Sequence, residues 1–327
     1  MSTEYVVSAD KSINYKRVMN LLFGKLGIFL GLFALMTVFS ILSPVFLSLG
    51  NLENILIQSA TNAIIAAGMT FVIISGEIDL SVGSILALTS IVSGEIMITT
   101  GSVWLGVGVA LLMGILMGVF NGVFVAYLGF PAFIVTLATM WLYRGSAYVY
   151  SGGQAVVGLP DGFRVLANGK FLYIPYIVWI MLIIYGLCYF VLTKLRMGRK
   201  IYATGDNSES ARLSGINVRA VKMIVFSISG CLTAVSALIL MARLNSAQPV
   251  AGMTFELTAI AAAVIGGTSL TKGGVGSIVG TLIGAVFIAT LQNGLVILNV
   301  SSFWQQLLMG IVVLIAVGID KYRKKLS

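Results

Sequence analysis

Long apolar stretches separated by short polar breaks run along nearly the whole chain. Residues 26–51 and 301–318 contain no charged side chain, and an uncharged apolar run of about 18 or more residues is typical of a membrane helix. With about 20 residues per span, the pattern predicts an all-α polytopic membrane protein with about ten transmembrane helices. The predicted spans lie near residues 27–47, 56–75, 80–99, 104–128, 131–150, 174–194, 221–243, 255–270, 275–298 and 302–320.

Three of these segments are irregular. Glu77, Asp79 and a glycine cluster interrupt the second and third, and the eighth is short. Lipid tolerates non-helical backbone only where protein or a water-filled cavity satisfies the freed polar groups. These segments are therefore candidates for broken or re-entrant helices.

The charged residues indicate how the spans are oriented. Only 9% of residues are charged and 58% are apolar, whereas about 25% are charged in soluble domains. Most basic residues behind the net charge of +9 gather at 11–25, 194–222 and 321–325, which fits cytoplasmic segments and a lipid bilayer rather than nucleic acid as the partner. The predicted parts are a cytoplasmic tail at 1–26, a transmembrane domain at 27–320 with a cytoplasmic loop at 195–221 and an external loop at 151–173, and a cytoplasmic tail at 321–327.

The two longest loops differ in composition. Residues 151–173 are rich in glycine, which indicates irregular surface structure. In the cytoplasmic loop, Asp206 and Asn207 are good N-cap residues and Gly215 supplies a stop. This pattern predicts one short amphipathic helix over 208–213 on the inner face.

Glycine recurs at every fourth position in two predicted spans. The two sets are Gly114, Gly118 and Gly122, and Gly276, Gly280 and Gly284. Such strips let helix backbones approach closely, so we expect packing within one subunit, with contact to a second subunit as the alternative. The quartets 82–85 and 275–278, both Val-Gly-Ser-Ile, each open an apolar helix, a similarity that fits chance as well as duplicated halves.

Residues that carry enzyme chemistry are scarce. The chain has no histidine, which excludes His-dependent triads, His-ligated metals and the usual proton shuttle. Cys188 and Cys231 lie within apolar runs, where packed thiols are expected rather than a disulfide. The stretch 266–273 lacks the Gly-Lys-Ser/Thr ending of a phosphate-binding loop. We therefore expect no catalytic residues, no metal site and no ATP site of this type.

Acidic residues close to the membrane interior are few. They are Glu77, Asp79, Glu95 and Glu256, each near the end of a predicted span. Side chains at such positions mostly reach interfacial water. We expect Glu77 and Asp79 to cap helices, with Asp79 at the start of the third span.

Neutral polar residues inside the spans form a candidate translocation pathway. They are Gln58, Asn62, Thr70, Asn121, Thr136, Gln292 and Asn293, with Thr139 as a further polar position. Any single one of these side chains more often joins two helices than contacts a cargo. As a set they favour an uncharged polar cargo over an ion or a proton-coupled solute.

Five motifs in one order resemble those of a known family. The first covers 68–84, and the others cover 211–218, 246–249, 261–270 and 273–281. The signature residues of the first motif are Gly68, Asp79, Ser81, Gly83 and Ser84. From about Ser43 to Asp320 the chain resembles the monosaccharide-type ABC importer permeases, the family of the bacterial ribose permease.

The resemblance implies a permease subunit that translocates a monosaccharide by alternating access and has no cofactor of its own. It implies a cytoplasmic ATP-binding cassette subunit that holds ATP and Mg, an external solute-binding protein and a second permease copy, identical or paralogous. It also implies the inner membrane of a bacterium, both termini cytoplasmic, and a cytoplasmic loop that docks on the ATPase. The coupling residues implied are Gly198, Arg199, Gly205, Asn207, Ala211, Arg212, Leu213, Gly215 and Ile216.

A secondary carrier or facilitator for a small polar solute is the alternative. It would function from this chain alone, and a proton-coupled carrier would use a buried titratable residue. An embedded enzyme and a structural scaffold fit the sequence less well. The cargo stays open, because ribose, another pentose or hexose, a deoxysugar or a sugar-like signal all fit.

Overall fold

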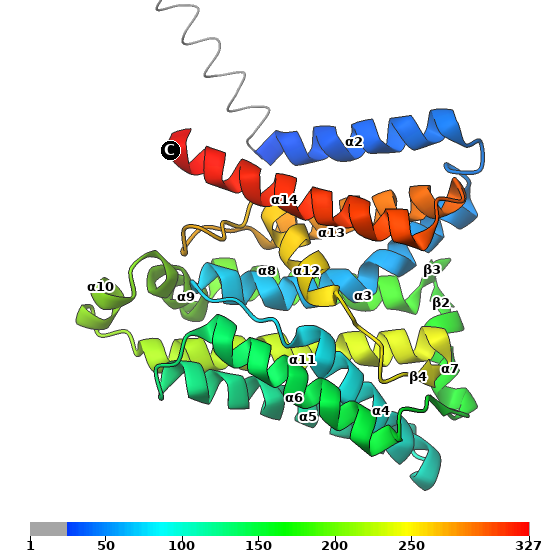
Figure 1. The fold of residues 1–327 in the computed structure, drawn as a ribbon, viewed down its shortest axis with the longest axis horizontal. Coiled ribbons are helices and arrows are strands. Elements are labelled where there is room, and N and C mark those ends of the chain that lie inside the picture. Colours follow the sequence, from blue (N-terminus) through cyan, green and yellow to red (C-terminus); the bar gives the residue numbers. More distant parts are fainter. Residues whose placement is uncertain (1–24, 327) are drawn as a thin grey trace, which may run out of the picture.

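The apolar stretches of the chain form helices that lie roughly side by side in the computed structural model (Figure 1). The structure describes residues 25–326, so the predicted tail at 1–26 lies almost wholly outside the described residues, and side chains are described from 27 to 321. The helices are α2 (Lys25–Leu42), α3 (Leu49–Ile74), α4 (Val82–Thr100), α5 (Val103–Ala126), α6 (Ala132–Ser151), α7 (Asp161–Asn168), α8 (Tyr176–Lys194), α9 (Arg196–Asp206), α10 (Ser208–Leu213), α11 (Val218–Leu244), α12 (Phe255–Ile265), α13 (Ile278–Ile297) and α14 (Ser302–Leu326). The strands are β1 (Val156–Val157), β2 (Lys170–Phe171), β3 (Ile174–Pro175) and β4 (Ser246–Ala247).

Each of the ten predicted spans coincides with one helix. Seven of these helices are long and apolar enough to cross a membrane, namely α3, α4, α5, α8, α11, α13 and α14. The apolar helices at Gly27–Leu42 and Phe255–Ile265 are shorter, and α6 contains Arg144 besides several hydroxyl-bearing residues. A helical polytopic membrane protein is therefore confirmed. Seven helices of the described residues meet these criteria of length and composition, and the count of about ten spans stays a prediction.

Helix α3 runs through the centre of the bundle and packs against α8, α11, α12 and α13. Its middle consists of small and apolar residues that are fully buried, among them Ala63, Ala66 and Ala67. At Gly68, an added Cβ would lie 3.0 Å from the Cα of Ser229 on α11. Small side chains therefore let four helices meet on one central helix.

Both glycine strips pack inside the chain, as expected. In α5, a Cβ on Gly114 or Gly118 would press on the backbone carbonyls of α11, at Gly230 and Phe226. In α13, a Cβ on Gly284 would press on the carbonyl of Ala262 in α12, and one on Gly280 would press on Gly266 just after α12. Gly276 lies before α13 and packs against the side chain of Ile74, so this strip is one glycine shorter than predicted. The strips therefore serve helix–helix contact within one subunit.

The segments predicted to be irregular contain non-helical residues between helices, and one of the adjacent helices, α12, is short. Residues 75–81 join α3 to α4, and residues 266–277 join α12 to α13. Helix α12 has 11 residues, about half of what a span needs, as expected of a broken or re-entrant helix. Of the two similar quartets, Val82 begins α4, whereas Ser277 is the N-cap of α13.

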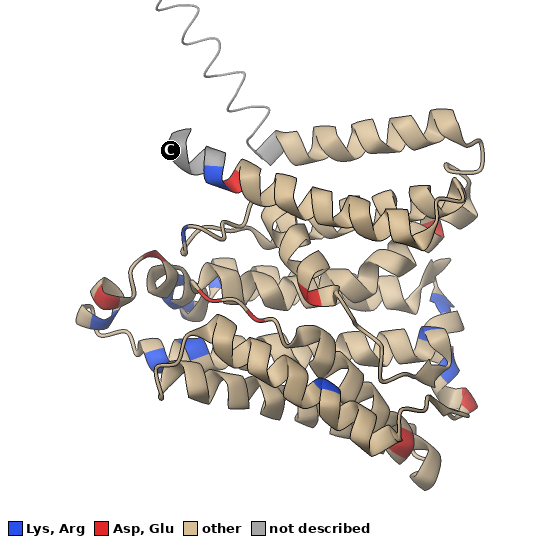
Figure 2. Cartoon of the chain, viewed as in Figure 1, with Lys and Arg blue, Asp and Glu red and all other residues tan. Residues whose placement is uncertain are grey.

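Charged residues gather at the two ends of the bundle (Figure 2). One end carries α9 and α10 and is called the α10 end; the other carries α7 and the four strands and is called the α7 end (Figure 1). At the α7 end, β1 pairs with β4 and β2 with β3, both antiparallel. The loop at 151–173 is therefore more regular than predicted, because it contains the eight-residue helix α7 and two short strands.

Candidate functional site

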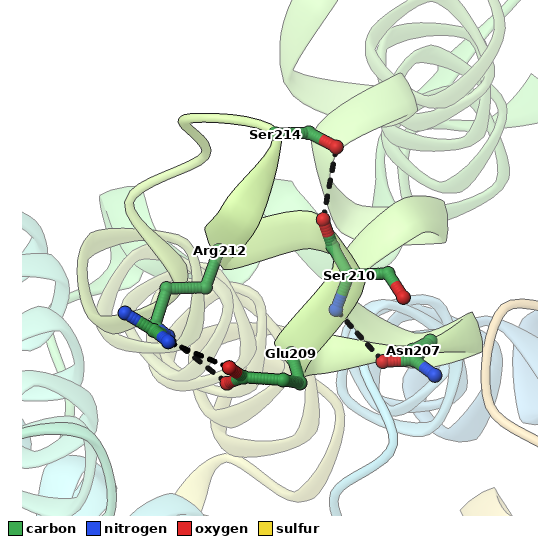
Figure 3. Close-up of polar contacts among 5 residues, drawn as sticks. All are labelled: Asn207, Glu209, Ser210, Arg212 and Ser214. Carbon is green, nitrogen blue, oxygen red and sulfur yellow. Dashed lines mark hydrogen bonds and ion pairs between the residues drawn. The ribbon is translucent and has the colours of Figure 1, made fainter.

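The α10 end presents a short helix whose boundaries follow from local sequence. The side chain of Asn207 accepts a hydrogen bond of 2.8 Å from the backbone N–H of Ser210 and so caps α10 (Figure 3). Gly215 ends the helix with a φ of +81°, which costs a glycine little. The predicted helix over 208–213 is confirmed.

The outer surface of α10 is charged and exposed. The guanidinium of Arg212 donates two hydrogen bonds, of 2.9 and 2.6 Å, to the carboxylate of Glu209 (Figure 3). These bonds lower the pKa of Glu209 from its usual range. Leu213 beside them is 73% exposed. The side chains of Glu209, Arg212 and Leu213 are therefore all accessible at the α10 end.

A second helix, α9, was not predicted and joins α10 to the bundle. Its Gly198 packs on the backbone carbonyls of α8, and Ile201 is fully buried. Gly205 packs against the carbonyl of Ile74 at the end of α3 and the N–H of Gly274. Gly76 also lies beside Gly205, because a Cβ on Gly76 would be 3.8 Å from the Cα of Gly205. The two joining segments, 75–81 and 266–277, therefore meet α9 at one point.

Hydrogen bonds tie the segment 266–277 to its neighbours. The N–H of Gly274 donates to the carbonyl of Ile74 at 2.8 Å, and the hydroxyl of Tyr202 on α9 donates to the carbonyl of Gly276 at 3.0 Å. Near the end of α14, Asp320 accepts from the N–H of Leu270 at 3.0 Å. Sequence reasoning did not single out Asp320 or Tyr202, and neither lies in a recognisable local motif.

The predicted coupling residues thus divide into two groups. Gly198, Gly205 and Ala211 are buried or half-buried and fix α9 and α10 against the bundle. Arg199, Asn207, Arg212, Leu213 and Gly215 are exposed, and Ile216 is half-buried. The exposed group is available for contact with another subunit, whereas the buried group would transmit its movement.

Glu77 forms an ion pair with Lys222 at the start of α11. A pocket of about 310 Å³ lies beside the pair and is lined also by Asn207 and Ser208 of the α10 segment. Glu77 therefore links the first joining segment to α11 instead of capping a helix.

Asp79 corrects one expectation, because it is fully buried and not in contact with interfacial water. Its carboxylate accepts hydrogen bonds from the N–H and hydroxyl of Ser81, at 2.9 and 2.6 Å, and from the hydroxyl of Ser229 on α11 at 3.0 Å. The side-chain amide of Asn121 on α5 donates to the hydroxyl of Ser81 at 2.8 Å. These four residues, called the Asp79 cluster, bring the start of α4, α5 and α11 together. The expectation that Asp79 lies at the start of α4 is confirmed.

The other signature residues also serve close packing. Gly68 lets α3 approach α11, and Gly83 lies against the backbone of Gly252. The hydroxyl of Ser84 donates to the carbonyl of Ser81 at 2.7 Å. The signature motif therefore builds the junction from which α4 begins.

The candidate pathway residues are not gathered on one surface. Thr70 and Thr281 share a hydrogen bond of 2.7 Å between α3 and α13, and Thr136 donates to the carbonyls of Ala132 and Ile78. Asn293, like Thr70, Thr136 and Asn121, is buried. These buried side chains mostly join helices.

The remaining pathway candidates are more open. Gln58 is exposed, and Asn62 and Gln292 are half-buried. The carbonyl oxygen of Asn62 accepts a hydrogen bond of 3.0 Å from the hydroxyl of Thr258 on α12. A role of any of the seven in translocation stays a prediction.

Two arginines inside the bundle were missed by sequence reasoning, which stressed the acidic residues. Arg144 lies in α6, and Arg243 lies in the last turn of α11, 3.5 Å from the hydroxyl of Thr61. A basic residue inside a predicted span was the available signal. Glu256 lies in the first turn of α12, near the start of the predicted span, but this helix is only about half as long as a span needs.

Comparison with known proteins identifies the family. The family model described as branched-chain amino acid transport system / permease component matches residues 51–317. The chain is 46% identical to the ribose import permease protein of Bacillus subtilis over 98% of this chain and 99% of the relative. It is 36% identical to the L-arabinose transport system permease protein of Escherichia coli over 93% of this chain and 91% of the relative.

A third relative is the ribose import permease protein of Haemophilus influenzae, 45% identical over 90% of this chain and 92% of the relative. No solved structure matches the chain. Because the family model and these relatives cover most of the chain, it belongs to this permease family and, as its motifs predicted, to the monosaccharide-type ABC importer permeases.

Proposed function

We propose that this chain is the membrane-spanning permease subunit of an ATP-driven ABC importer that carries a monosaccharide across the bacterial inner membrane. Relatives named for ribose, L-arabinose and D-allose support this class of cargo, and ribose is the first cargo to test. The chain is a transport component rather than an enzyme. We propose that ATP and Mg bind a separate ATPase subunit, that an external solute-binding protein delivers the sugar, and that a second permease copy completes the passage.

The observation that carries the coupling mechanism is the position of α9. Gly205 packs against Ile74 at the end of α3 and against Gly274 in the segment before α13. A displacement of α10 by a partner would therefore reach both joining segments through one rigid helix. We propose that closure of the ATPase subunits moves α10 and, through α9, tilts the helices around the passage.

The proposed orientation places the α10 end and both chain termini in the cytoplasm. The basic segment around α9 and α10 supports this through the positive-inside rule. All ten helices then lie within the membrane, with α12 as the helical half of a broken span that the non-helical residues 248–254 complete. The loop at 151–173 faces the external binding protein.

The test of this function is ribose uptake into vesicles that contain the permease, its ATPase subunit and its binding protein. Uptake is expected to require ATP inside the vesicle and to stop without the ATPase subunit. Uptake that persists without the ATPase subunit, or that stops only when the proton gradient is removed, would instead support a facilitator or secondary carrier.

Docking of the ATPase on α10 has a matched test. Arg212→Glu is expected to weaken association of the ATPase subunit and to uncouple ATP hydrolysis from uptake, because it places two carboxylates together on the docking surface. Arg164→Glu is the control, since Arg164 forms a similar exposed pair with Asp161 three residues earlier at the α7 end. Equal association of the ATPase with both variants would refute docking through α10.

A further inference from the structure

The start of α12 lies at about half the depth of the bundle. At about 1.5 Å per residue, its 11 residues span about 16 Å, half of the hydrocarbon core of about 30 Å. Its last residue leads into the segment 266–277, which contacts α9 at the α10 end. Phe255, the first residue of α12, therefore lies near mid-depth, and the chain from 248 to 254 runs to it in non-helical form.

A second non-helical segment, residues 75–81, reaches the same depth before α4 begins. Gly83, in the first turn of α4, packs against the backbone of Gly252, and a Cβ on either glycine would collide with the other residue. Two helices, α4 and α12, therefore begin close together in the interior of the bundle. Non-helical backbone at this depth needs hydrogen-bond partners from protein or water.

Arg144 supplies such partners. From α6 its guanidinium donates hydrogen bonds of 2.6 Å to the carbonyls of Pro249 and Ala251 and one of 3.0 Å to the carbonyl of Gly83. These bonds use three of the five N–H donors of an arginine. Arg144 thus joins the non-helical residues 248–254 to the start of α4.

Glu256 lies at the same junction. It is in the first turn of α12, and its Oε2 would lie 2.7 Å from a Cβ on Gly83, the residue whose carbonyl Arg144 binds. Both Glu256 and Arg144 are half-buried. Next to them, Met253 is 60% exposed, and Leu257 is exposed as well. The junction therefore opens onto a face that no part of the described chain covers.

A face with two partly exposed charged groups at mid-depth is unsuited to lipid. Ionisable side chains within membrane spans almost always face the protein interior or a water-filled cavity, and they mark substrate pathways. Helix α5 differs, because it carries no charged side chain and its exposed large residues, such as Leu116, are apolar. The face with Glu256 and Arg144 therefore borders water rather than lipid.

We propose that Glu256 and Arg144, at the junction where α4 and α12 begin, form the polar contact that this subunit makes with the hydroxyl groups of its monosaccharide during passage. This inference rests on the proposed function and deepens it. A carboxylate accepts hydrogen bonds from sugar hydroxyls, and a guanidinium donates to them. The pair serves a neutral polyol without adding a net charge to the passage.

Aromatic residues on the same face of α6 complete the contact. Trp141 and Tyr148 lie three and four residues from Arg144, so they share its helix face, and both are exposed. Their rings offer apolar surface to the C–H groups of a sugar, and their polar atoms offer hydrogen bonds. The arrangement fits a cargo that has hydroxyl groups on an apolar ring.

The first test measures whether water reaches this face. In a variant without Cys188 and Cys231, Met253→Cys is expected to react with a charged, membrane-impermeant thiol reagent in the full transporter with its ATPase and binding protein. Leu116→Cys is the control at similar depth on the apolar face of α5, and it is expected not to react. Absence of reaction at position 253 in an active transporter would overturn the inference.

The second test measures the amount of sugar moved per ATP hydrolysed. Glu256→Gln keeps the shape of the side chain and is expected to lower this ratio about tenfold, the effect of losing one charged hydrogen bond, while ATP hydrolysis continues. Glu95→Gln, a half-buried acidic residue of α4 closer to the α7 end, is the control and keeps the ratio. An unchanged ratio for Glu256→Gln would overturn the inference.

The two tests separate this inference from the proposed function. Uptake by the unmodified transporter is measured first, and absence of ATP-dependent uptake of any monosaccharide refutes the proposed function. With uptake intact, failure of either test refutes only the cargo contact. If Glu256→Gln does not fold, the reaction at Met253→Cys, with slower labelling during sugar transport as the supporting result, decides the inference.

Discussion

Helix α10 and the Asp79 cluster show two ways in which polar residues are held in this membrane protein. In α10, Asn207, Glu209 and Arg212 bond to residues only three positions away, and their side chains are exposed. In the cluster, Asp79 bonds to Ser229, 150 residues later in the chain, and both are fully buried. A local motif thus builds a surface that is free to dock, whereas a distributed cluster fixes the helices behind it.

The two regions also differ in how much stability is lost when a hydrogen bond is removed. Water replaces a lost hydrogen bond on an exposed helix, so surface ion pairs contribute little to stability. A buried group that loses its partner has no such replacement and costs about 1–3 kcal/mol. Substitutions in the cluster should therefore affect folding, and those in α10 should affect partner binding.

The largest effect is expected from Asp79→Ala. The change leaves the N–H and hydroxyl of Ser81 and the hydroxyl of Ser229 without their acceptor, which should destabilise the protein by about 3 kcal/mol or more. Thermal unfolding in detergent measures the loss. Ser229→Ala removes a single bond and should cost about 1 kcal/mol; equal losses for the two variants would contradict the central position of Asp79.

Gly205→Val is expected to have the next largest effect. Its side chain would collide with the carbonyl of Ile74 and the N–H of Gly274, so α9 must shift at a cost of about 2 kcal/mol. Uptake should fall more than ATPase binding, because α10 itself is intact. Gly186→Val, at a helical glycine with open space around it, is the control. Similar uptake by both variants would argue against transmission through α9.

Gly215→Val should have a smaller, local effect. A β-branched residue with a φ of +81° costs about 1–2 kcal/mol, which would fray the end of α10 without unfolding the bundle. Reduced co-purification of the ATPase subunit with an unchanged unfolding temperature is the expected result. Gly215→Asn should behave almost like the original chain, because asparagine tolerates this conformation. A loss of ATPase co-purification as large as that of Gly215→Val would show that Gly215 is needed for something other than its backbone conformation.

The smallest effect is expected from pH. The pKa of Glu209 is lowered in the folded protein by its bonds to Arg212, so the pair's contribution is fully present above the ordinary glutamate pKa of about 4.3 and is lost as the pH falls through the lowered value. Binding of the ATPase subunit to α10 should therefore stay constant between about pH 8 and about pH 6. A marked fall within this range would show that another group controls docking.

Features set by neighbouring residues could be predicted from the sequence. The ten helical segments, the cap at Asn207, the stop at Gly215 and the packing of the glycine strips all follow from spacing and residue type. The motif at 68–84 was also sufficient to indicate the family. Helix α9 could not be predicted, because Arg196–Asp206 contains glycine, threonine and several charges, and its contacts with α3, α8 and α11 hold it in place.

The positions and partners of the charged residues inside the bundle could not be predicted from the sequence. Arg144 stands in an apolar helix, and its partners Pro249, Ala251 and Gly83 lie 105, 107 and 61 residues away. A span length estimated from hydropathy placed Glu256 near a membrane surface, whereas the half-length of α12 places it near mid-depth. Hydropathy averages over a window and does not register a helix that begins inside the bundle.

The sequence by itself determined that this protein spans a membrane, has no histidine chemistry, presents a capped helix at one end and belongs to a sugar permease family. Only the tertiary structure decided that Asp79 is buried, that α9 meets both joining segments and that Arg144 and Glu256 share one junction. The physical reason is that helix formation and capping depend on bonds within a few residues. Whether a charged side chain can be buried depends on hydrogen-bond partners that only folding brings near.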